Sequence, residues 1–370
     1  MSYQISYKKQ ILFGIILLLS IFLIIESMAR AYDFFNPYCN LKNDVEVSQN
    51  LTYWQKTQIC HDWMTLNWYW DDKTDVYKPE PNQHKTTVNI NEFGFRGDEI
   101  SQDKDDSIFR IFVLGGSTTI NLRSISDEKT LPGYLQNFFN INKPNQKFEV
   151  INAGIPRISS TQELSIVENK LINFQPDMII IYDGTNDLEL PYGHTPSKND
   201  LRAKVGDFIK RIFPYWETGR VIFNIIDKNS HSEESYSFDL SSVDKKVNLW
   251  KNNIEQICLQ GKANTFDTVI ILQPILGTGE RILTQYEKNQ FLLYDQGNAL
   301  IGYDKFGDEL NNLNEHCTIV KDFRNVFDNQ TGSIFYDNAH IKFQANEIVA
   351  EEIFKTILPL IDEKSLSINN

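Results

Sequence analysis

From residue 107 onward the chain alternates short apolar runs with stretches of helical periodicity, a pattern that constrains the fold more than any other feature. Five apolar runs read as buried strands: "IFRIFVL", "KFEVIN", "DMIIIYD", "DTVIILQP" and "CTIVKD". Helical patterns lie between them; in "SSTQELSIVENKLINFQPD", Ser160 and Glu163 have capping-box spacing. Parallel strands need such crossover helices. Residues 107–365 are therefore predicted to form an α/β fold, a three-layer α/β/α sandwich around a central parallel sheet.

Small polar residues follow these predicted strands, where sheets of this kind bind their ligands. The first strand ends in "GGST" with Ser117, the second in "NAG" with Gly154, and the third in "GTND" with Asn186. Before the last helix, "FYDNAHIKF" carries Asp337 and His340 three residues apart. A hydroxyl, a base, a carboxylate and neutral N–H donors together are what acyl transfer requires.

Each of these residues also has a structural interpretation. Ser117 and Asn186 would serve as helix caps, Asp337 as a turn residue, and His340 as an ordinary structural histidine. Their joint occurrence at successive strand ends favours catalysis. A serine hydroxyl needs a neighbouring base, and an imidazole with a pKa of roughly 6.5 serves near neutral pH.

The blocks "GGST", "NAG", "GTND" and "DNAH" resemble, in this order, the four motifs of the SGNH (GDSL-type) hydrolase superfamily. The resemblance covers about residues 108–361 and implies an SGNH or flavodoxin-like fold with esterase-like activity. The sequence departs from the family pattern at Gly116, where members usually have an aspartate. This departure bears on substrate positioning more than on catalysis.

The resemblance also implies a role for each candidate site residue. Ser117 would be the nucleophile, His340 the base and Asp337 its orienting partner. The backbone amides of Ser117 and Gly154, with the Asn186 side chain, would form the oxyanion hole. No cofactor is expected, and the histidines and acids show no metal-ligand spacing.

The N-terminal sequence predicts that most of the chain is exported from the cytoplasm. Two lysines precede an apolar run over residues 11–29 that carries one charge, Glu26. About 20 apolar residues span a bilayer, and the preceding lysines favour a cytoplasmic N-terminus. Residues 1–31 are thus predicted to be a single-pass transmembrane anchor, with the rest extracytoplasmic. A signal sequence cleaved after Ala31, which would release a secreted protein, stays open.

Two further segments accompany the predicted sandwich. Residues 32–106 are rich in aromatic side chains and are expected to form an N-terminal extension that packs on the main domain; aromatic platforms for a sugar are the alternative. An insertion is expected at about 195–243. Its residues 202–226 are expected to pack by helices against the sheet, with a membrane-facing segment or a lid as alternatives, and the polar stretch that follows is expected to be a solvated loop.

The four cysteines show no CxxC spacing, so a zinc site is poorly supported. Outside the cytoplasm disulfides are expected, and Cys39–Cys60 is the natural local pair. Cys258 and Cys317 lie far downstream, and buried free thiols remain the alternative.

The net charge and the predicted extracytoplasmic location restrict the classes of function that the chain can have. The net charge of −13 argues against nucleic-acid binding. The leading hypothesis is a membrane-tethered serine esterase that hydrolyses ester-linked acyl groups, with O-acetyl groups on envelope carbohydrate as candidate substrates. The alternatives are an O-acyltransferase with the same residues and a non-catalytic binding or assembly protein of this fold.

Overall fold

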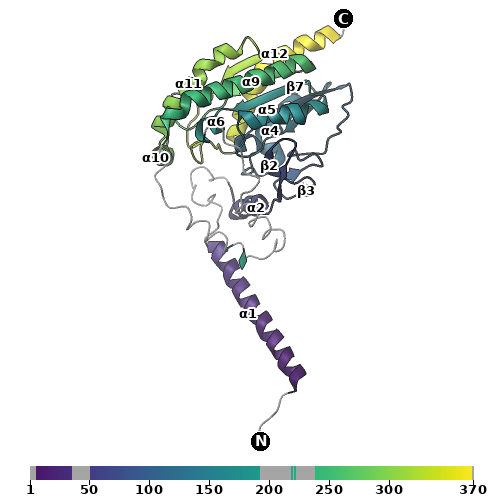
Figure 1. Cartoon of the computed structure of the whole chain (residues 1–370), viewed down its shortest axis with the longest axis vertical. Coiled ribbons are helices and arrows are strands. Elements are labelled where there is room, and N and C mark those ends of the chain that lie inside the picture. The colour runs from purple at the N-terminus through teal and green to yellow at the C-terminus, as the bar shows by residue number, and fades with distance from the viewer. Residues whose placement is uncertain (1–5, 36–50, 192–217, 220, 222–237, 369–370) are drawn as a thin grey trace. The chain divides into compact units, whose positions relative to one another are not determined.

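The computed structural model describes residues 6–35, 51–191, 218–219, 221 and 238–368 (Figure 1). The chain divides into two compact units. One comprises residues 1–43 and 199–234, and the other comprises residues 44–198 and 235–370. The predicted insertion of about 195–243 lies mostly outside the described residues. The predicted domain boundaries at residues 31 and 106 stay predictions.

The second unit is built on a five-stranded parallel sheet, with one strand at each predicted apolar run. The strands are β5 (Ile108–Gly115), β6 (Lys147–Asn152), β7 (Met178–Asp183), β8 (Asp267–Leu272) and β9 (Ile319–Asp322). Their order across the sheet is β6-β5-β7-β8-β9. This is the doubly wound order 2-1-3-4-5 of flavodoxin-like sheets, in which the strand order reverses between the first and third strands.

Helices cover both faces of this sheet (Figure 1). The core on one face contains α4 (Leu131–Asn142) and α12 (Ala345–Ile368). The core on the other face contains α5 (Ser160–Asn169), α9 (Val243–Asn264) and α11 (Gln296–Leu313). The predicted three-layer α/β/α sandwich is thereby confirmed.

The strands read as continuous apolar runs because both of their faces are buried. Along β5, Ile111 and Val113 belong to the core with α4 and α12, whereas Phe112 and Leu114 belong to the core with the other three helices. All four side chains are fully buried. The period-2 alternation of a strand therefore distributes apolar side chains to two cores.

The start of α5 differs from the predicted one by a residue. The N-cap is Ser159, which forms the capping box with Gln162 rather than Ser160 with Glu163. Ser160 and Glu163 are instead fully buried on the inner side of this helix. Three successive hydroxyl residues at this point give three candidate caps, so spacing alone does not select one.

Shorter elements complete the sandwich. They are α3 (Ser117–Ile120), η2 (Asp127–Lys129), η3 (Leu171–Phe174), α6 (Thr185–Glu189), η4 (Leu240–Ser242) and α10 (Gln285–Leu293). Two of them, α3 and α6, begin directly after β5 and β7 and carry the candidate residues discussed below.

Residues 44–106 of the aromatic-rich extension belong to the same compact unit as the sandwich. Its described part contains α2 (Tyr53–Met64), the antiparallel pair β1 (Trp68–Asp71) and β2 (Val76–Pro79), and the antiparallel pair β3 (Gln83–His84) and β4 (Asn89–Ile90). A small apolar core joins it to the chain that follows α3. The extension therefore packs directly on the segment that carries Ser117.

A disulfide joins Cys258 on α9 to Cys317, which precedes β9. It closes a loop whose ends are 59 residues apart in sequence. The alternative of free thiols is wrong for this pair. The predicted Cys39–Cys60 pair includes Cys39, which lies outside the described residues.

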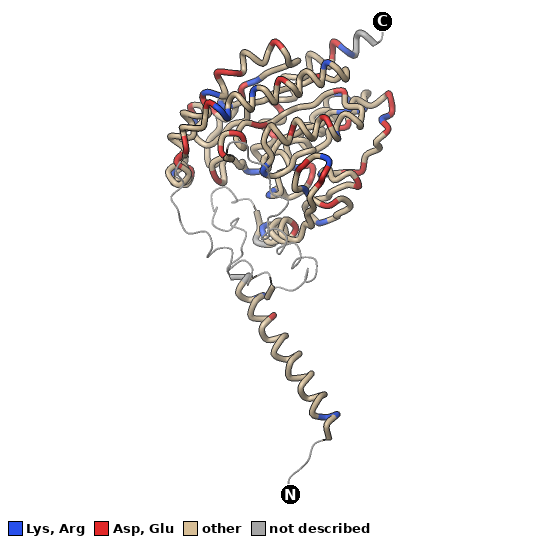
Figure 2. The backbone as a smooth tube through the Cα atoms, viewed as in Figure 1, with Lys and Arg blue, Asp and Glu red and all other residues tan. Residues whose placement is uncertain are grey.

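In the first unit, α1 (Tyr7–Phe35) is long and apolar enough to cross a membrane. Residues 7–32 have a mean hydropathy of 2.7, and Figure 2 shows α1 uncharged over most of its length. The acid within the apolar run, Glu26, forms an ion pair with Arg30 and accepts hydrogen bonds from the amide and hydroxyl of Thr218. These contacts stabilise the Glu26 carboxylate, which would otherwise be costly within an apolar segment.

Candidate active site

The candidate residues lie where the strand order reverses. Ser117 is the first residue of α3, directly after β5, and Asn186 lies in α6, directly after β7. Because β5 and β7 are hydrogen-bonded neighbours, their carboxyl ends bring these two turns together. Ligands bind at such a switch point in doubly wound sheets.

Three side chains from two distant parts of the sequence form a continuous series of polar contacts at this edge. The Ser117 Oγ atom lies 2.7 Å from His340 Nε2, although the two residues are 223 positions apart. The His340 Nδ1 atom lies 2.9 Å from both carboxylate oxygens of Asp337. Ser117 and His340 are partly exposed, so a ligand can reach them.

The structural interpretations of Ser117 as a helix cap and Asp337 as a turn residue have different outcomes. The N-cap of α3 is Gly116, so the interpretation of Ser117 as an N-cap is wrong. Asp337 does stabilise its turn, since its Oδ1 accepts hydrogen bonds from the amides of Ala339 and His340 at 3.1 and 2.8 Å. The same carboxylate thus fixes the backbone and holds the imidazole in one orientation.

The surroundings of Asp337 keep it ionised. Burial alone would raise its pKa, but the adjacent His340, the Arg123 guanidinium and the backbone amide outweigh burial and hold the pKa of Asp337 well below its usual range. Arg123 Nη1 lies 3.3 Å from Asp337 Oδ2. A carboxylate that stays charged can orient the imidazole and stabilise its protonated form.

A second carboxyl group, Glu189 at the end of α6, lies near Asp337. Burial and the negative charge of Asp337 raise the pKa of Glu189 to about 8, although the positive charge of Lys246 acts in the opposite direction. The Asn338 side-chain amide donates a hydrogen bond to Glu189. Glu189 is therefore mostly protonated at neutral pH and adds little negative charge beside the Asp337–His340 pair.

The three predicted oxyanion donors differ in whether their N–H groups already have an acceptor. Asn186 Nδ2 donates one hydrogen bond to the Ile158 carbonyl at 2.6 Å, which fixes the amide and leaves its second N–H available. The Ser117 amide is in the first turn of α3, where N–H groups have no intrahelical acceptor. The Gly154 amide differs, because it already donates to Asn152 Oδ1 at 3.1 Å.

Two glycines allow this close packing. A Cβ atom on Gly116 would lie 2.4 Å from Asn186 Nδ2, and one on Gly154 would lie 2.3 Å from the Ile120 nitrogen. Both distances are far below an ordinary contact. A side chain at 116 would therefore displace the Asn186 amide, whereas one at 154 would collide with backbone atoms.

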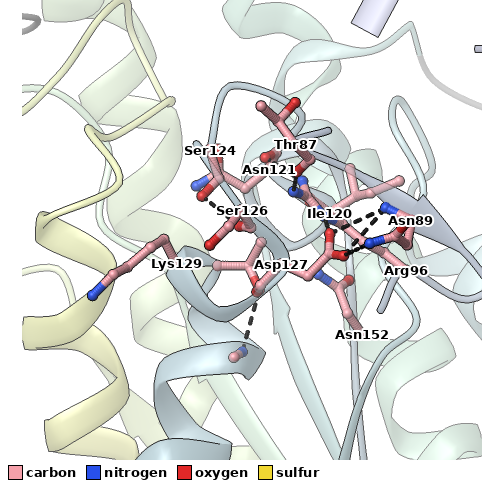
Figure 3. Close-up of polar contacts among 12 residues, drawn as sticks. Thr87, Asn89, Arg96, Ile120, Asn121, Ser124, Ser126, Asp127, Lys129 and Asn152 are labelled. Atoms are coloured by element: carbon pink, nitrogen blue, oxygen red, sulfur yellow. Dashed lines mark hydrogen bonds and ion pairs between the residues drawn. The ribbon is translucent and has the colours of Figure 1, made fainter. Parts of the chain in front are cut away.

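A buried arginine from the extension supports the turn after Ser117 (Figure 3). The Arg96 side chain is almost completely buried. Its Nη1 donates to the carbonyls of Ile120 and Asn121 at 2.8 and 2.6 Å, and its Nη2 donates to the Thr87 carbonyl at 2.7 Å. The Ile120 and Asn121 carbonyls lie at the end of α3, so Arg96 satisfies acceptors that a one-turn helix leaves free.

The charge of Arg96 is balanced within the same network (Figure 3). Asp127 accepts from Arg96 Nε at 2.7 Å and from the Asn89 side-chain amide at 2.8 Å. The Arg96 amide also donates to the carbonyl of Asn152, whose side chain donates to the Thr119 carbonyl at 3.0 Å. The extension is thereby tied to both the Ser117 turn and the Gly154 segment.

Three buried carboxyl groups, the carboxyl cluster, lie beside the Asn186 turn: Glu163 on α5, Asp183 at the end of β7 and Asp187 on α6. Burial and the neighbouring carboxylates raise the pKa of Glu163 and Asp183 well above their usual values. Asp187 accepts hydrogen bonds from the amide and hydroxyl of Ser160 at 2.9 and 2.5 Å. Burial raises the pKa of Asp187 as well, but the hydrogen bonds from Ser160 oppose that rise and favour its ionised form.

Sequence reasoning did not find Arg96, Arg123, Glu189 or the carboxyl cluster. Arg123 contacts Asp337 across 214 residues, and no motif or periodicity links the two. Arg96 had a weak signal, since it is a lone basic residue between glycine-containing turns in "FGFRGDE". In the described part of the chain, no group of three or more histidine, cysteine or acidic side chains is arranged to hold a metal ion.

Comparisons with known proteins show similarity to solved structures alone, at low sequence identity. No family model matches the chain, and no curated protein does. The solved structures it resembles include LAE5, an alpha/beta hydrolase from the metagenome of Lake Arreo, Spain, with 10% identity and a TM-score of 0.40 over 67% of this chain and 94% of that one.

Two others are TesA, with 12% identity and a TM-score of 0.40 over 68% of this chain and 99% of that one, and Axe2, an acetylxylan esterase from Geobacillus stearothermophilus. Axe2 is 13% identical, with a TM-score of 0.38 over 67% of this chain and 94% of that one. Likeness at this level does not bear on function, which must be inferred from this chain's own residues.

Proposed function

We propose that the protein is a serine esterase that hydrolyses ester-linked acyl groups, with Ser117 as nucleophile, His340 as base and Asp337 as orienting carboxylate. One observation carries the proposal: the unbroken series of contacts from Ser117 Oγ through the His340 ring to Asp337, at 2.7 and 2.9 Å. Two chain segments more than 200 residues apart meet in it, at the edge where doubly wound sheets bind ligands.

In the first half of the reaction, His340 Nε2 takes the proton of the Ser117 hydroxyl as its oxygen attacks the ester carbonyl carbon. Asp337, held ionised, accepts from His340 Nδ1 and stabilises the imidazolium that forms. The imidazolium then gives its proton to the departing alcohol oxygen, and the acyl group stays on Ser117. In the second half, a water molecule repeats the attack and releases the acid.

The negative oxygen of each tetrahedral intermediate needs neutral donors aimed at it. The Ser117 amide and the free N–H of Asn186 are the best candidates, because the Asn186 amide is already fixed by Ile158. Gly154 would join them only after its amide releases Asn152. We therefore assign Gly154 a weaker contribution than the resemblance implies.

We infer an extracytoplasmic location with α1 as a membrane anchor and the N-terminus in the cytoplasm. The Cys258–Cys317 disulfide supports it, since disulfides persist in oxidising compartments. The apolar α1 supports an anchor, although cleavage after Ala31 would give a secreted enzyme. N-terminal sequencing of the mature protein distinguishes the two, because a cleaved protein begins after residue 31.

The substrate class proposed is an acyl ester, with O-acetylated envelope carbohydrate as the candidate. Acyl transfer to a sugar hydroxyl would use the same residues, with the sugar replacing water in the second half. Incubation with a labelled acetyl donor and a glycan acceptor separates the two, because transfer leaves the label on the glycan. A binding protein of this fold would turn over no ester at all.

Hydrolysis of p-nitrophenyl acetate tests the proposal directly. The Ser117→Ala variant should lose hydrolysis while keeping its melting temperature. The matched control is Ser241→Ala, which removes the hydroxyl of an exposed serine in η4 and should leave the rate unchanged. Equal rates in wild type and Ser117→Ala would refute the nucleophile assignment.

A further inference from the structure

One cation lies directly beside the proposed catalytic groups. The Arg123 guanidinium is 3.3 Å from Asp337 at the nearest N–O pair. Its central carbon lies 5.3 Å from the centre of the Tyr336 ring and 5.9 Å from that of the Trp63 ring. The Arg123 side chain is 27% exposed, so solvent and ligands reach it.

Most hydrogen-bonding capacity of Arg123 is unused. A guanidinium has five N–H donors. Among the described residues, the hydrogen bond to Asp337 is the one that Arg123 makes. Arg96, by contrast, is buried and donates to three carbonyls and a carboxylate. Arg96 thus has a complete structural role, whereas Arg123 keeps donors free at the site.

Asp337 does not need Arg123 to be held in place. Two backbone amides and the His340 ring already bind its carboxylate. The guanidinium helps to keep Asp337 ionised, but that single contact does not account for its remaining donors. The position of Arg123 is better explained by a ligand that approaches Ser117.

The two aromatic rings give Arg123 a defined position. A guanidinium over an aromatic face is held by cation–π attraction, and it keeps its edge N–H groups free. Trp63 belongs to α2, so the extension supplies part of this surface. The planar fork of an arginine matches a carboxylate, which accepts two parallel hydrogen bonds.

We propose that Arg123, flanked by Trp63 and Tyr336, binds a carboxylate on the alcohol part of the substrate, so that the ester is carried by an acidic sugar such as a uronate. The proposal rests on the esterase function proposed above. It also accounts for a cation at the site of a chain whose net charge of −13 would otherwise repel such a substrate.

A pair of near-isosteric esters tests this inference. The anionic ester is 4-acetoxybenzoate, and the neutral one is 4-acetoxybenzamide. The quantity measured is kcat/KM for the anionic ester divided by kcat/KM for the neutral ester. In Arg123→Gln this ratio should fall about tenfold or more, mainly through KM of the anionic ester, whereas Lys355→Gln, a charge change at an exposed pair on α12, should leave it unchanged. If Arg123 acts only through Asp337, both esters slow equally; an unchanged ratio therefore overturns the proposal.

A binding measurement keeps this inference separate from the esterase proposal. Saturation-transfer NMR with glucuronate and with glucose reports weak binding without turnover. Wild type should show glucuronate signals well above those of glucose, and Arg123→Gln, shown to be folded by its melting temperature, should lose that excess. If no ester is hydrolysed but this pattern holds, the esterase function fails and the carboxylate site stands. If glucuronate and glucose give equal signals in wild type, the carboxylate site is refuted.

Discussion

Replacing Gly116 by alanine should remove most of the activity by moving a neighbouring side chain. A Cβ atom at 116 would lie 2.4 Å from Asn186 Nδ2, about 1 Å closer than an ordinary contact of 3.4 Å. The backbone of Gly116 has a φ of −80°, which alanine adopts, so the clash is the main consequence. The hydrogen bond from Asn186 to the Ile158 carbonyl resists the displacement.

The magnitude follows from the proposed role of the Asn186 amide. Loss of one oxyanion donor costs about 100- to 1000-fold in kcat, or about 3–4 kcal/mol, with little change in KM because the oxyanion forms after binding. Gly116→Ala should show a loss of this order in p-nitrophenyl acetate hydrolysis. Gly297→Ala in α11 is the matched control, because nothing lies within 4 Å of a Cβ there, and it should leave kcat unchanged.

A double-mutant cycle makes the reasoning refutable. If Gly116→Ala acts by displacing the Asn186 amide, combining it with Asn186→Ala should give no further loss beyond Asn186→Ala alone. Losses that multiply would show that alanine at 116 acts through another group. A Gly116→Ala variant with wild-type kcat would show that Asn186 does not serve the transition state.

Three further outcomes are expected. Replacing Cys258 and Cys317 by alanine should lower the free energy of unfolding by up to about 4 kcal/mol in urea denaturation, the loop-closure value for ends 59 residues apart; no change would contradict this. The carboxyl groups of Glu163 and Asp183 bind protons more tightly in the folded protein than in the unfolded chain. Their contribution to the free energy of unfolding is therefore complete below about pH 4. It decreases as pH rises, by up to about 1.4 kcal/mol per pH unit for each proton. Glu163→Gln should therefore gain stability relative to wild type as pH rises above about 4.5, and a parallel pH dependence would refute it. Asp337→Asn should lower kcat for p-nitrophenyl acetate about 10,000-fold, and a loss below tenfold would argue against its orienting role.

The sheet was predictable because its strands are buried on both faces. Runs such as residues 178–181 are continuously apolar, and segments with helical periodicity lie between the strands. The helix boundaries were less predictable. At α5, Ser159 and Ser160 are equivalent as caps in sequence, and only burial of Glu163 in the folded unit decides between them.

The candidate site was predictable where its residues occur in motifs and not where they meet only in space. Ser117, Asn186 and the Asp337–His340 pair follow strands or precede a helix, so the topology brings them to one edge. Arg123 follows no such rule, because its neighbour Asp337 is 214 residues away. The engagement of the Gly154 amide by Asn152 also depends on a side-chain rotamer that no pattern reveals.

Labelling with a fluorophosphonate tests the central claim, that Ser117 is an activated nucleophile, most directly. The reagent reacts with serines whose proton is taken by a neighbouring base, and it needs no knowledge of the natural substrate. The wild-type protein should be labelled once, on the peptide that contains Ser117, and His340→Ala should abolish the reaction. A folded wild-type protein that stays unlabelled, or carries the label on another serine, would contradict the account.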